Sequence, residues 1–257
     1  NNIIYSKKFK KMSRLLLLNK INKYYSINSV SIQVLQDIDL LVEKGESLAL
    51  VGESGSGKTT LSRIILGLTQ PDSGDISWGD NEIRPKVSAV FQNPKDAMNP
   101  RKRIWESIAE PLIINEKKRV NYFREKCLRI ASEVGLEKNL IDRFPFELSG
   151  GQIQRAVIAR ALIVMPDLII LDEPTSALDI SVQAKIINLL TDLQIEYNLT
   201  YIFITHDLQL VHYLAKKIFV LKNGKCVEKG EIKDVFSKPN NLYTRKLLEA
   251  GGVINIP

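Results

Sequence analysis

The stretch GESGSGKT at residues 52–59 decides the fold of this chain. It matches the pattern GxxxxGK[ST] of the P-loop, in which a glycine-rich backbone wraps around phosphate groups. An apolar run at 48–51 precedes it, and a helical pattern from Thr60 to Leu68 follows it. In this setting the helix N-terminus adds unpaired N–H donors and a positive partial charge. We therefore predict a phosphate site formed by Gly52, Glu53, Ser54, Gly55, Ser56, Gly57, Lys58, Thr59 and Thr60.

Two side chains of this loop have separate predicted roles. Lys58 is placed to reach the β- and γ-phosphates of a nucleoside triphosphate, and the Thr59 hydroxyl can ligate Mg²⁺. A glycine-rich turn that binds nothing is the alternative, and the features described next argue against it.

Composition restricts the class of protein. A chain of 257 residues with 44% apolar and 25% charged residues can fold around a real core. Its longest apolar stretch, 161–165, is too short to span a bilayer, so a membrane role would require a partner. Cys127 and Cys226 lack partners at metal-ligand spacing, which favours a reduced, cytoplasmic chain. The net charge of +7 comes from scattered Lys and Arg, which favours a solvated basic face over nucleic-acid binding.

The rest of the chain predicts an α/β sheet with two additions. Alternating apolar residues in 13–22 and 32–42 predict an antiparallel ribbon. The run Pro71–Gly74 predicts a turn. Helical periodicity from Asn93 to Ala161 predicts an inserted group of helices, one of them ended by Gly135. The other expected strands are 48–51, 88–91, 168–171, 200–204, 218–221 and 225–227, and the other expected helices are 152–163, 182–197, 208–215, 234–236 and 242–248.

An acidic pair follows the buried strand at 168–171. Asp172 and Glu173 come directly after four aliphatic residues, where a P-loop fold needs carboxylates. We predict that Asp172 helps to hold Mg²⁺ and that Glu173 orients or deprotonates the attacking water. Two carboxylates that only cap a strand are the alternative.

A second phosphate-binding pattern identifies a family. Ser149 is a good N-cap, and the two glycines after it expose N–H groups at the start of a helix. Together with the P-loop, this pattern resembles the signature of the ATP-binding cassette (ABC) ATPases, which closes on the nucleotide of a partner subunit. The matching residues are Leu148, Ser149, Gly150, Gly151 and Gln152.

The resemblance runs from about Leu15 to Leu248 and implies further site residues. Gln92 matches the Q-loop glutamine, which senses Mg²⁺ and the γ-phosphate, and His206 matches the switch histidine. Tyr25 matches the aromatic residue that stacks on adenine, with Tyr24 as the alternative. The D-loop, which crosses the dimer interface, matches Ser176, Ala177, Leu178 and Asp179. His212 has no such match and is expected on a helix surface.

The family fold divides the chain into expected parts. Residues 12–92 and 162–257 would form a RecA-like core with an antiparallel β subdomain, and 93–161 a helical subdomain with the signature. Residues 1–11 look unlike the rest and precede Met12, so we expect a leader that is either a cloning remnant or an upstream extension.

Three stretches resemble one branch of the family, the peptide/nickel importer ATPases. They are 92–112, 175–184 and 242–248. The short C-terminal part, which lacks a cysteine-rich cluster, is more similar to the smaller nickel-importer subunit. This resemblance implies a subunit that uses ATP and Mg²⁺ to power uptake of nickel or another metal complex, with peptide import as the alternative.

The resemblance also implies partners and a location. We expect transmembrane permease subunits, a second and related ATPase subunit (or a second copy), an indirectly linked substrate-binding protein, and no nucleic acid. The chain would lie on the cytoplasmic face of the inner or plasma membrane. The competing hypotheses are a soluble ABC ATPase of translation or DNA repair, an exporter ATPase, and a regulatory ATP-binding module without turnover.

Overall fold

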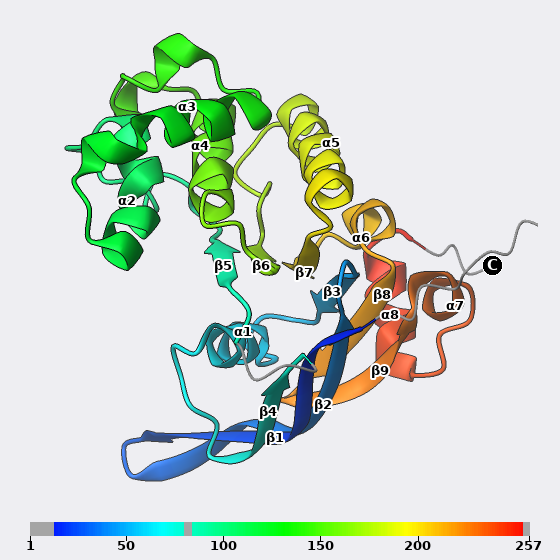
Figure 1. The fold of residues 1–257 in the computed structure, drawn as a ribbon. Coiled ribbons are helices and arrows are strands. Elements are labelled where there is room, and N and C mark those ends of the chain that lie inside the picture. Colours follow the sequence, from blue (N-terminus) through cyan, green and yellow to red (C-terminus); the bar gives the residue numbers. More distant parts are fainter. Residues whose placement is uncertain (1–12, 80–83, 254–257) are drawn as a thin grey trace, which may run out of the picture.

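The computed structural model describes residues 13–79 and 84–253, in three groups of elements (Figure 1). An antiparallel sheet lies at one end, a helical group at the other, and a larger sheet between them (Figure 1). The expected α/β P-loop fold with an antiparallel β part and inserted helices is confirmed. The predicted leader at 1–11 lies outside the described residues.

The antiparallel sheet contains β1 (Arg14–Ile27), β2 (Val30–Glu43) and β4 (Ser73–Trp78) in the order β2-β1-β4. The predicted ribbon is β1 with β2, although β1 continues beyond its predicted end at Asn22. The turn predicted at Pro71–Gly74 is wrong in its second half, because Ser73 and Gly74 begin β4. Ser73 pairs with Asn22, and the Asp72 carboxylate accepts the Tyr24 N–H at 2.6 Å, which aligns this segment with β1.

The larger sheet has the strand order β5-β6-β7-β3-β8-β9. Neighbouring strands from β5 to β8 are parallel, and β9 pairs antiparallel with β8. The predicted Asn223-Gly224 hairpin turn joins β8 to β9, with φ values of 46° and 75° that suit a type I′ turn. The strands are β3 (Ser47–Val51), β5 (Val87–Val90), β6 (Leu168–Asp172), β7 (Thr200–Ile204), β8 (Lys217–Lys222) and β9 (Lys225–Glu231).

The helices follow the predicted periodicity with small shifts at their ends. Helix α1 ends at Leu66 because Gly67 takes the left-handed conformation, with φ 76°. Gly135, with φ 67°, follows the end of α3 as predicted. The helices are α1 (Lys58–Leu66), α2 (Ile104–Glu116), α3 (Arg124–Glu133), α4 (Gly150–Leu162), α5 (Ile180–Tyr197), α6 (Leu208–Leu214), α7 (Ile232–Ser237) and α8 (Leu242–Ala250), with 3₁₀ turns at Val120–Phe123, Lys138–Leu140 and Pro145–Glu147.

The central strands of the larger sheet, β3, β6, β7 and β8, are buried on both faces, which explains their largely apolar sequences. Successive side chains of a strand point to opposite faces. In β3, Leu48 and Leu50 therefore pack with α1 and the antiparallel sheet, whereas Ala49 and Val51 pack with α5, α6 and the helical group. The order of strands and helices thus places the carboxyl ends of β3, β5, β6 and β7 at one edge.

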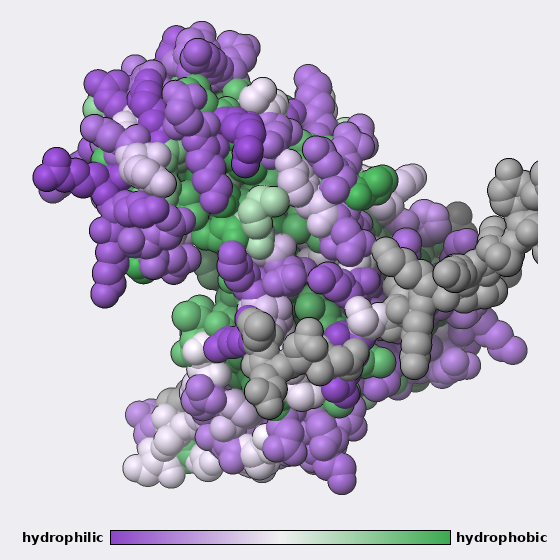
Figure 2. Space-filling model, in the orientation of Figure 1, coloured by the Kyte–Doolittle hydropathy of each residue, from purple (hydrophilic) through white to green (hydrophobic). Residues whose placement is uncertain are grey.

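The surface agrees with this layering. Polar residues cover most of the visible helical group, and apolar residues reach the surface mainly at the waist between that group and the sheets (Figure 2). In the part of the chain that the structure describes, no helix has the length and apolar character to cross a membrane. Cys127 is fully buried and Cys226 partly buried, and neither forms a disulfide.

Candidate active site

The P-loop connects β3 to α1 through backbone conformations that glycine permits. Gly52 has φ 152°, and an added Cβ there would lie 2.1 Å from the carbonyl oxygen of Leu221. Gly57, the N-cap of α1, has φ 110°, and its Cβ would lie 2.9 Å from the carbonyl oxygen of Val34. Both positions exclude larger residues, so the loop packs tightly between β8 and β2.

Lys58 begins α1 and turns back over the loop. Its ammonium group donates to the carbonyl oxygens of Gly52 at 2.7 Å and Glu53 at 2.8 Å. Burial lowers the pKa of Lys58, and the nearby carboxylates of Glu173, Asp172 and Glu53 oppose that shift. A partly desolvated cation at a helix N-terminus is suited to an anionic ligand.

The predicted acid pair lies at the end of β6. Burial raises the pKa of Asp172, and the neighbouring Glu173 charge raises it further. Glu173 has φ 47°, which is uncommon for a residue other than glycine, and its N–H donates to the carbonyl of Ile204 at 2.8 Å. This backbone turn starts the segment that leads to α5.

The Glu173 carboxylate joins three strand ends. One oxygen accepts a hydrogen bond from Gln92 Nε2 at 2.6 Å, and the other lies 2.7 Å from His206 Nδ1. Gln92 follows β5, Glu173 follows β6 and His206 follows β7, and these strands are neighbours. The fold therefore brings together Glu173, predicted from its place after a buried strand, and Gln92 and His206, which the family resemblance implied.

A cavity of about 510 Å³ contains these groups. P-loop residues form one side, and Gln92, Asp172, Glu173 and His206 form another. Val34 of β2 and Leu247 of α8 also line it, and sequence reasoning missed both as site residues. Leu247 lies within the 242–248 run that carries a family resemblance, but nothing in that run indicated contact with the P-loop.

Neither predicted adenine-stacking tyrosine lines this cavity. Tyr25 is half-buried in β1, with the Lys23 ammonium group 5.5 Å from its ring centroid. Tyr24 is 44% exposed and pairs with Gln33 of β2. His212 is exposed on α6, as predicted.

The signature begins a well-capped helix. The Ser149 hydroxyl accepts the Gln152 N–H at 3.4 Å, and the Gln152 side chain accepts the Ser149 N–H at 2.9 Å, which completes a capping box. A Cβ on Gly151 would lie 2.6 Å from Val182 Cγ1, so the glycine lets α4 approach α5 closely. Residues 148–152 do not line the described cavity of their own chain.

The D-loop connects this region to the acid pair. The Ser176 hydroxyl donates to the carbonyl of Glu173 at 3.2 Å. Asp179 caps α5 and accepts the Val182 N–H at 2.9 Å, and hydrogen bonds from Val182 and Ser181 lower its pKa. Leu178 lies beside the signature, 3.4 Å from a Cβ placed on Gly150.

The oxygen donors of the cavity suit magnesium bound together with a nucleotide. Thr59, Gln92 and Asp172 provide a hydroxyl, an amide and a carboxylate at its walls. Among the described residues, no cluster of three His, Cys, Asp or Glu side chains could hold a metal alone. Magnesium usually takes one or two carboxylates and completes its shell with phosphate oxygens and water, so this donor set fits it.

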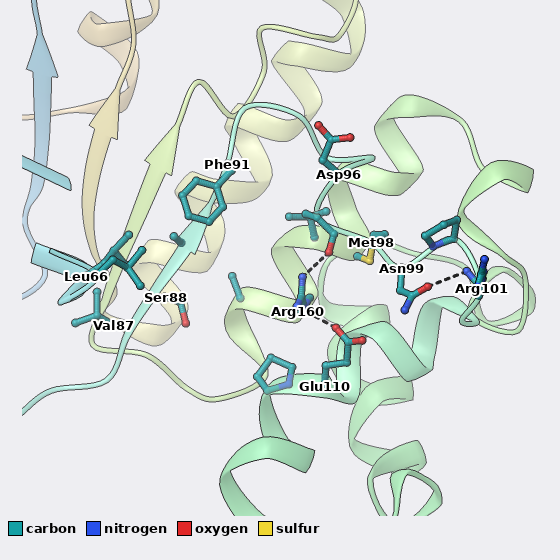
Figure 3. A pocket seen from close by; sticks show the side chains of 17 residues that line it. Leu66, Val87, Ser88, Phe91, Asp96, Met98, Asn99, Arg101, Glu110 and Arg160 are labelled. Carbon is teal, nitrogen blue, oxygen red and sulfur yellow. Dashed lines mark hydrogen bonds and ion pairs between the residues drawn. The ribbon is translucent and has the colours of Figure 1, made fainter. Parts of the chain in front are cut away.

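A second cavity, of about 1020 Å³, lies between β5, the segment after Gln92, and helices α2 and α4. Figure 3 shows Leu66, Val87 and Phe91 on its sheet side, across from Arg160 and Glu110. Arg160 pairs with Glu110 at 2.9 Å and donates to the carbonyl of Ala97. Because Phe91 is 48% exposed, this groove presents apolar area beside a half-buried ion pair.

Comparison with known proteins agrees with the geometry. The ABC transporter family profile matches residues 35–176. The dipeptide transport ATP-binding protein DppF of Haemophilus influenzae is 42% identical over 91% of this chain and 77% of its own length. The oligopeptide transport ATP-binding protein OppF of Lactococcus lactis is 39% identical over 93% of this chain and 81% of its own.

Solved structures show the same fold. The ATP-binding cassette MJ0796, in a dimeric post-hydrolysis state bound to ADP and Pi, has a TM-score of 0.74 at 30% identity and covers 85% of this chain and 99% of its own. CbiO1 from Clostridium perfringens, part of the ABC transporter complex CbiONQ, has a TM-score of 0.77 at 28% identity and covers 95% of this chain and 100% of its own.

These findings define the chain as an ATP-binding, ATP-hydrolysing protein with the P-loop fold. It belongs to the ABC transporter family and, within it, to the peptide/nickel importer ATPases. The relatives described above are named for peptide transport. They give no support to nickel, the main expectation from the sequence, and back its peptide alternative better.

Proposed function

We propose that this chain is the ATP-hydrolysing subunit of an importer of dipeptides or oligopeptides. The observation that carries the proposal is the 42% identity to a dipeptide transport ATP-binding protein over 91% of the chain. Such a subunit does not itself contact the transported solute. The relatives therefore support the choice of peptide as the solute, and the site supports ATP hydrolysis as the chemistry.

The P-loop is the proposed phosphate site. Residues 52–60 would surround the phosphates with N–H groups, and Lys58 would keep its contact with the Gly52 carbonyl while its other ammonium N–H groups donate to β- and γ-phosphate oxygens. Thr59, Asp172 and Gln92 are the proposed ligands of Mg²⁺, which would neutralise charge that develops on the phosphates. Tyr25, or Tyr24, remains the proposed adenine contact.

Glu173 is the proposed general base for hydrolysis. Its two carboxylate oxygens already contact Gln92 and His206, which fix its orientation. Glu173 would accept a proton from the water that attacks the γ-phosphate, while His206 and Gln92 contact the γ-phosphate side of the site. The γ-phosphate bond to ADP then breaks, and the products are ADP and inorganic phosphate.

A second ATPase subunit would complete the site. Residues 148–152 do not line the described cavity of their own chain, so Ser149 and Gly151 are free to cover the ATP of a partner. The D-loop, 176–179, would cross the same interface. We propose a related ATPase as the usual partner and a second copy as the alternative.

The groove between β5, α2 and α4 is the proposed contact with the permease. It adjoins the segment after Gln92, so closure at the nucleotide would move its wall. In this arrangement residues 93–161 would form the helical subdomain, and residues 12–92 and 162–257 the core and β subdomain. The subunit would lie at the periphery of the membrane on its cytoplasmic face. A substrate-binding protein would be linked to it only indirectly.

Uptake in source cells tests the proposal. Cells that carry the wild-type chain or Glu173→Gln are assayed side by side for uptake of a labelled dipeptide and of nickel. We expect dipeptide uptake to fall to background and nickel uptake to stay unchanged. Loss of nickel uptake alone would contradict peptide import but keep the transport role.

If neither uptake changed, three explanations would remain: another transported solute, a redundant transporter, or the alternative of a soluble ATPase. Retention of the wild-type chain on ribosomes, RNA or DNA at physiological salt would then support that alternative.

A further inference from the structure

Helix α8 lies far from the P-loop in sequence but contributes to the same cavity. Leu247 lines the nucleotide cavity, and Tyr243, one turn earlier, is buried at 8% exposure. Asn241 caps the helix by accepting the Tyr243 N–H at 2.8 Å. The Asn241 cap and the buried Tyr243 ring therefore hold the first turn of α8 in place.

The Tyr243 hydroxyl contacts the P-loop backbone directly. It accepts the N–H of Glu53 at 3.0 Å across 190 positions of sequence. The Lys222 ammonium group lies 4.5 Å from the centroid of the same ring. Burial raises the pKa of Tyr243, so the phenol stays neutral at physiological pH.

This hydrogen bond acts on the peptide unit that also contacts Lys58. The Gly52 carbonyl and the Glu53 N–H belong to one planar peptide group. Lys58 donates to the oxygen of that group at 2.7 Å, and Tyr243 accepts from its nitrogen at 3.0 Å. Because the unit is planar, fixing its N–H also fixes the direction of the oxygen that Lys58 contacts.

The other end of α8 contacts the segment after His206. Gln209, in the first turn of α6, donates to the carbonyl of Gly251 at 3.3 Å. A Cβ on Gly251 would lie 2.9 Å from Leu208, so the two helices approach closely there. Helix α8 thus contacts both sides of the nucleotide cavity.

We propose that Tyr243 is a positioning residue for ATP binding, which sets the first peptide unit of the P-loop and through it the ammonium group of Lys58. This role rests on ATP binding at the P-loop and does not depend on which solute is imported. It predicts an effect on nucleotide affinity, because the contact is made with the backbone of the phosphate-binding loop.

Removing one hydroxyl tests this role. Tyr243→Phe keeps the ring and leaves the Glu53 N–H without its acceptor. We expect the KM for ATP and the Kd for a fluorescent ATP analogue to rise roughly three- to tenfold, the loss expected from one hydrogen bond, while kcat stays within about twofold because the groups around Glu173 are unchanged. Tyr213→Phe is the matched control, since Tyr213 is 75% exposed on α6, and should change neither constant.

Each outcome decides the question. Unchanged KM and Kd in folded Tyr243→Phe would overturn the proposal, as would a fall in kcat alone or an equal change in Tyr213→Phe. If the wild-type chain bound no ATP, the P-loop assignment itself would fail, which is a result distinct from failure of the Tyr243 contact.

Discussion

Glu173 combines an uncommon backbone conformation with two short hydrogen bonds to its carboxylate. Glu173 has φ 47° and contacts Gln92 and His206 through different oxygens. Left-handed backbone costs free energy for a residue with a Cβ, and such strain is concentrated at functional sites. The geometry supports the role that sequence order suggested for Glu173.

Glu173→Gln isolates the base from the geometry. The amide oxygen can still accept from Gln92, and the amide N–H can donate to His206, but the group no longer accepts a proton from water. We expect kcat for ATP hydrolysis to fall by about 100-fold or more, with ATP affinity retained. Phosphate release and equilibrium ATP binding by the purified chain measure the two effects.

Glu196→Gln, on the exposed side of α5, is the control and should hydrolyse ATP at the wild-type rate. Wild-type turnover in Glu173→Gln would assign the base to another group. A parallel loss of ATP affinity would show that the substitution disturbs the cavity.

Some site residues could be predicted from the sequence and others could not. Glu173 could be predicted because it follows a buried strand, and Gln92 and His206 because they match family motifs. The three meet because the carboxyl ends of parallel strands lie together. Tyr243 and Leu247 could not be predicted, because their contact depends on how α8 packs, and no local pattern encodes an interaction across 190 positions.

At the scale of elements, α4 combines a structural and a proposed functional role in Ser149. Its hydroxyl caps the helix, and the same residue is proposed to contact the ATP of a partner. Ser149→Ala should lose both roles, with a stability cost of about 1 kcal/mol for the cap. Ser149→Asn should keep the cap, because Asn is an equally good N-cap residue.

The two variants therefore separate the roles. Thermal unfolding should show a lower Tm for Ser149→Ala and a nearly wild-type Tm for Ser149→Asn, whereas ATP-driven uptake in cells should fall in both. Normal uptake with Ser149→Asn would limit Ser149 to the cap.

Elements were predicted best where the pattern was local. The buried strands β6 and β7 follow from runs of aliphatic, aromatic and β-branched residues with clear ends. Strand β4 was missed because Pro71–Gly74 has the composition of a turn, yet pairing with β1 decides the conformation of Ser73 and Gly74. Tertiary pairing outweighed local propensity at that position.

At the scale of the whole molecule, one chain holds the parts of the proposed site but not in contact. The P-loop and acid pair line the cavity, whereas residues 148–152 do not. The sequence could predict both halves, but assembly is a property of two chains. The ATP-binding cassette MJ0796, which has the same fold, is dimeric in its structure with ADP and Pi.

Association of two subunits should depend on the bound nucleotide. ATP between two subunits contributes its phosphates to both, so its binding should favour association, and hydrolysis should reverse it. Glu173→Gln retains ATP, so its dimer should accumulate when ATP is added and disappear with ADP. Light scattering after size exclusion measures the mass of the chain alone and mixed with a second ATPase of the same transporter. Lys58→Ala should stay monomeric with ATP, because it lacks the phosphate contact. If the mass did not change with ATP, either for the chain alone or for the mixture, an interface built on the nucleotide would be contradicted.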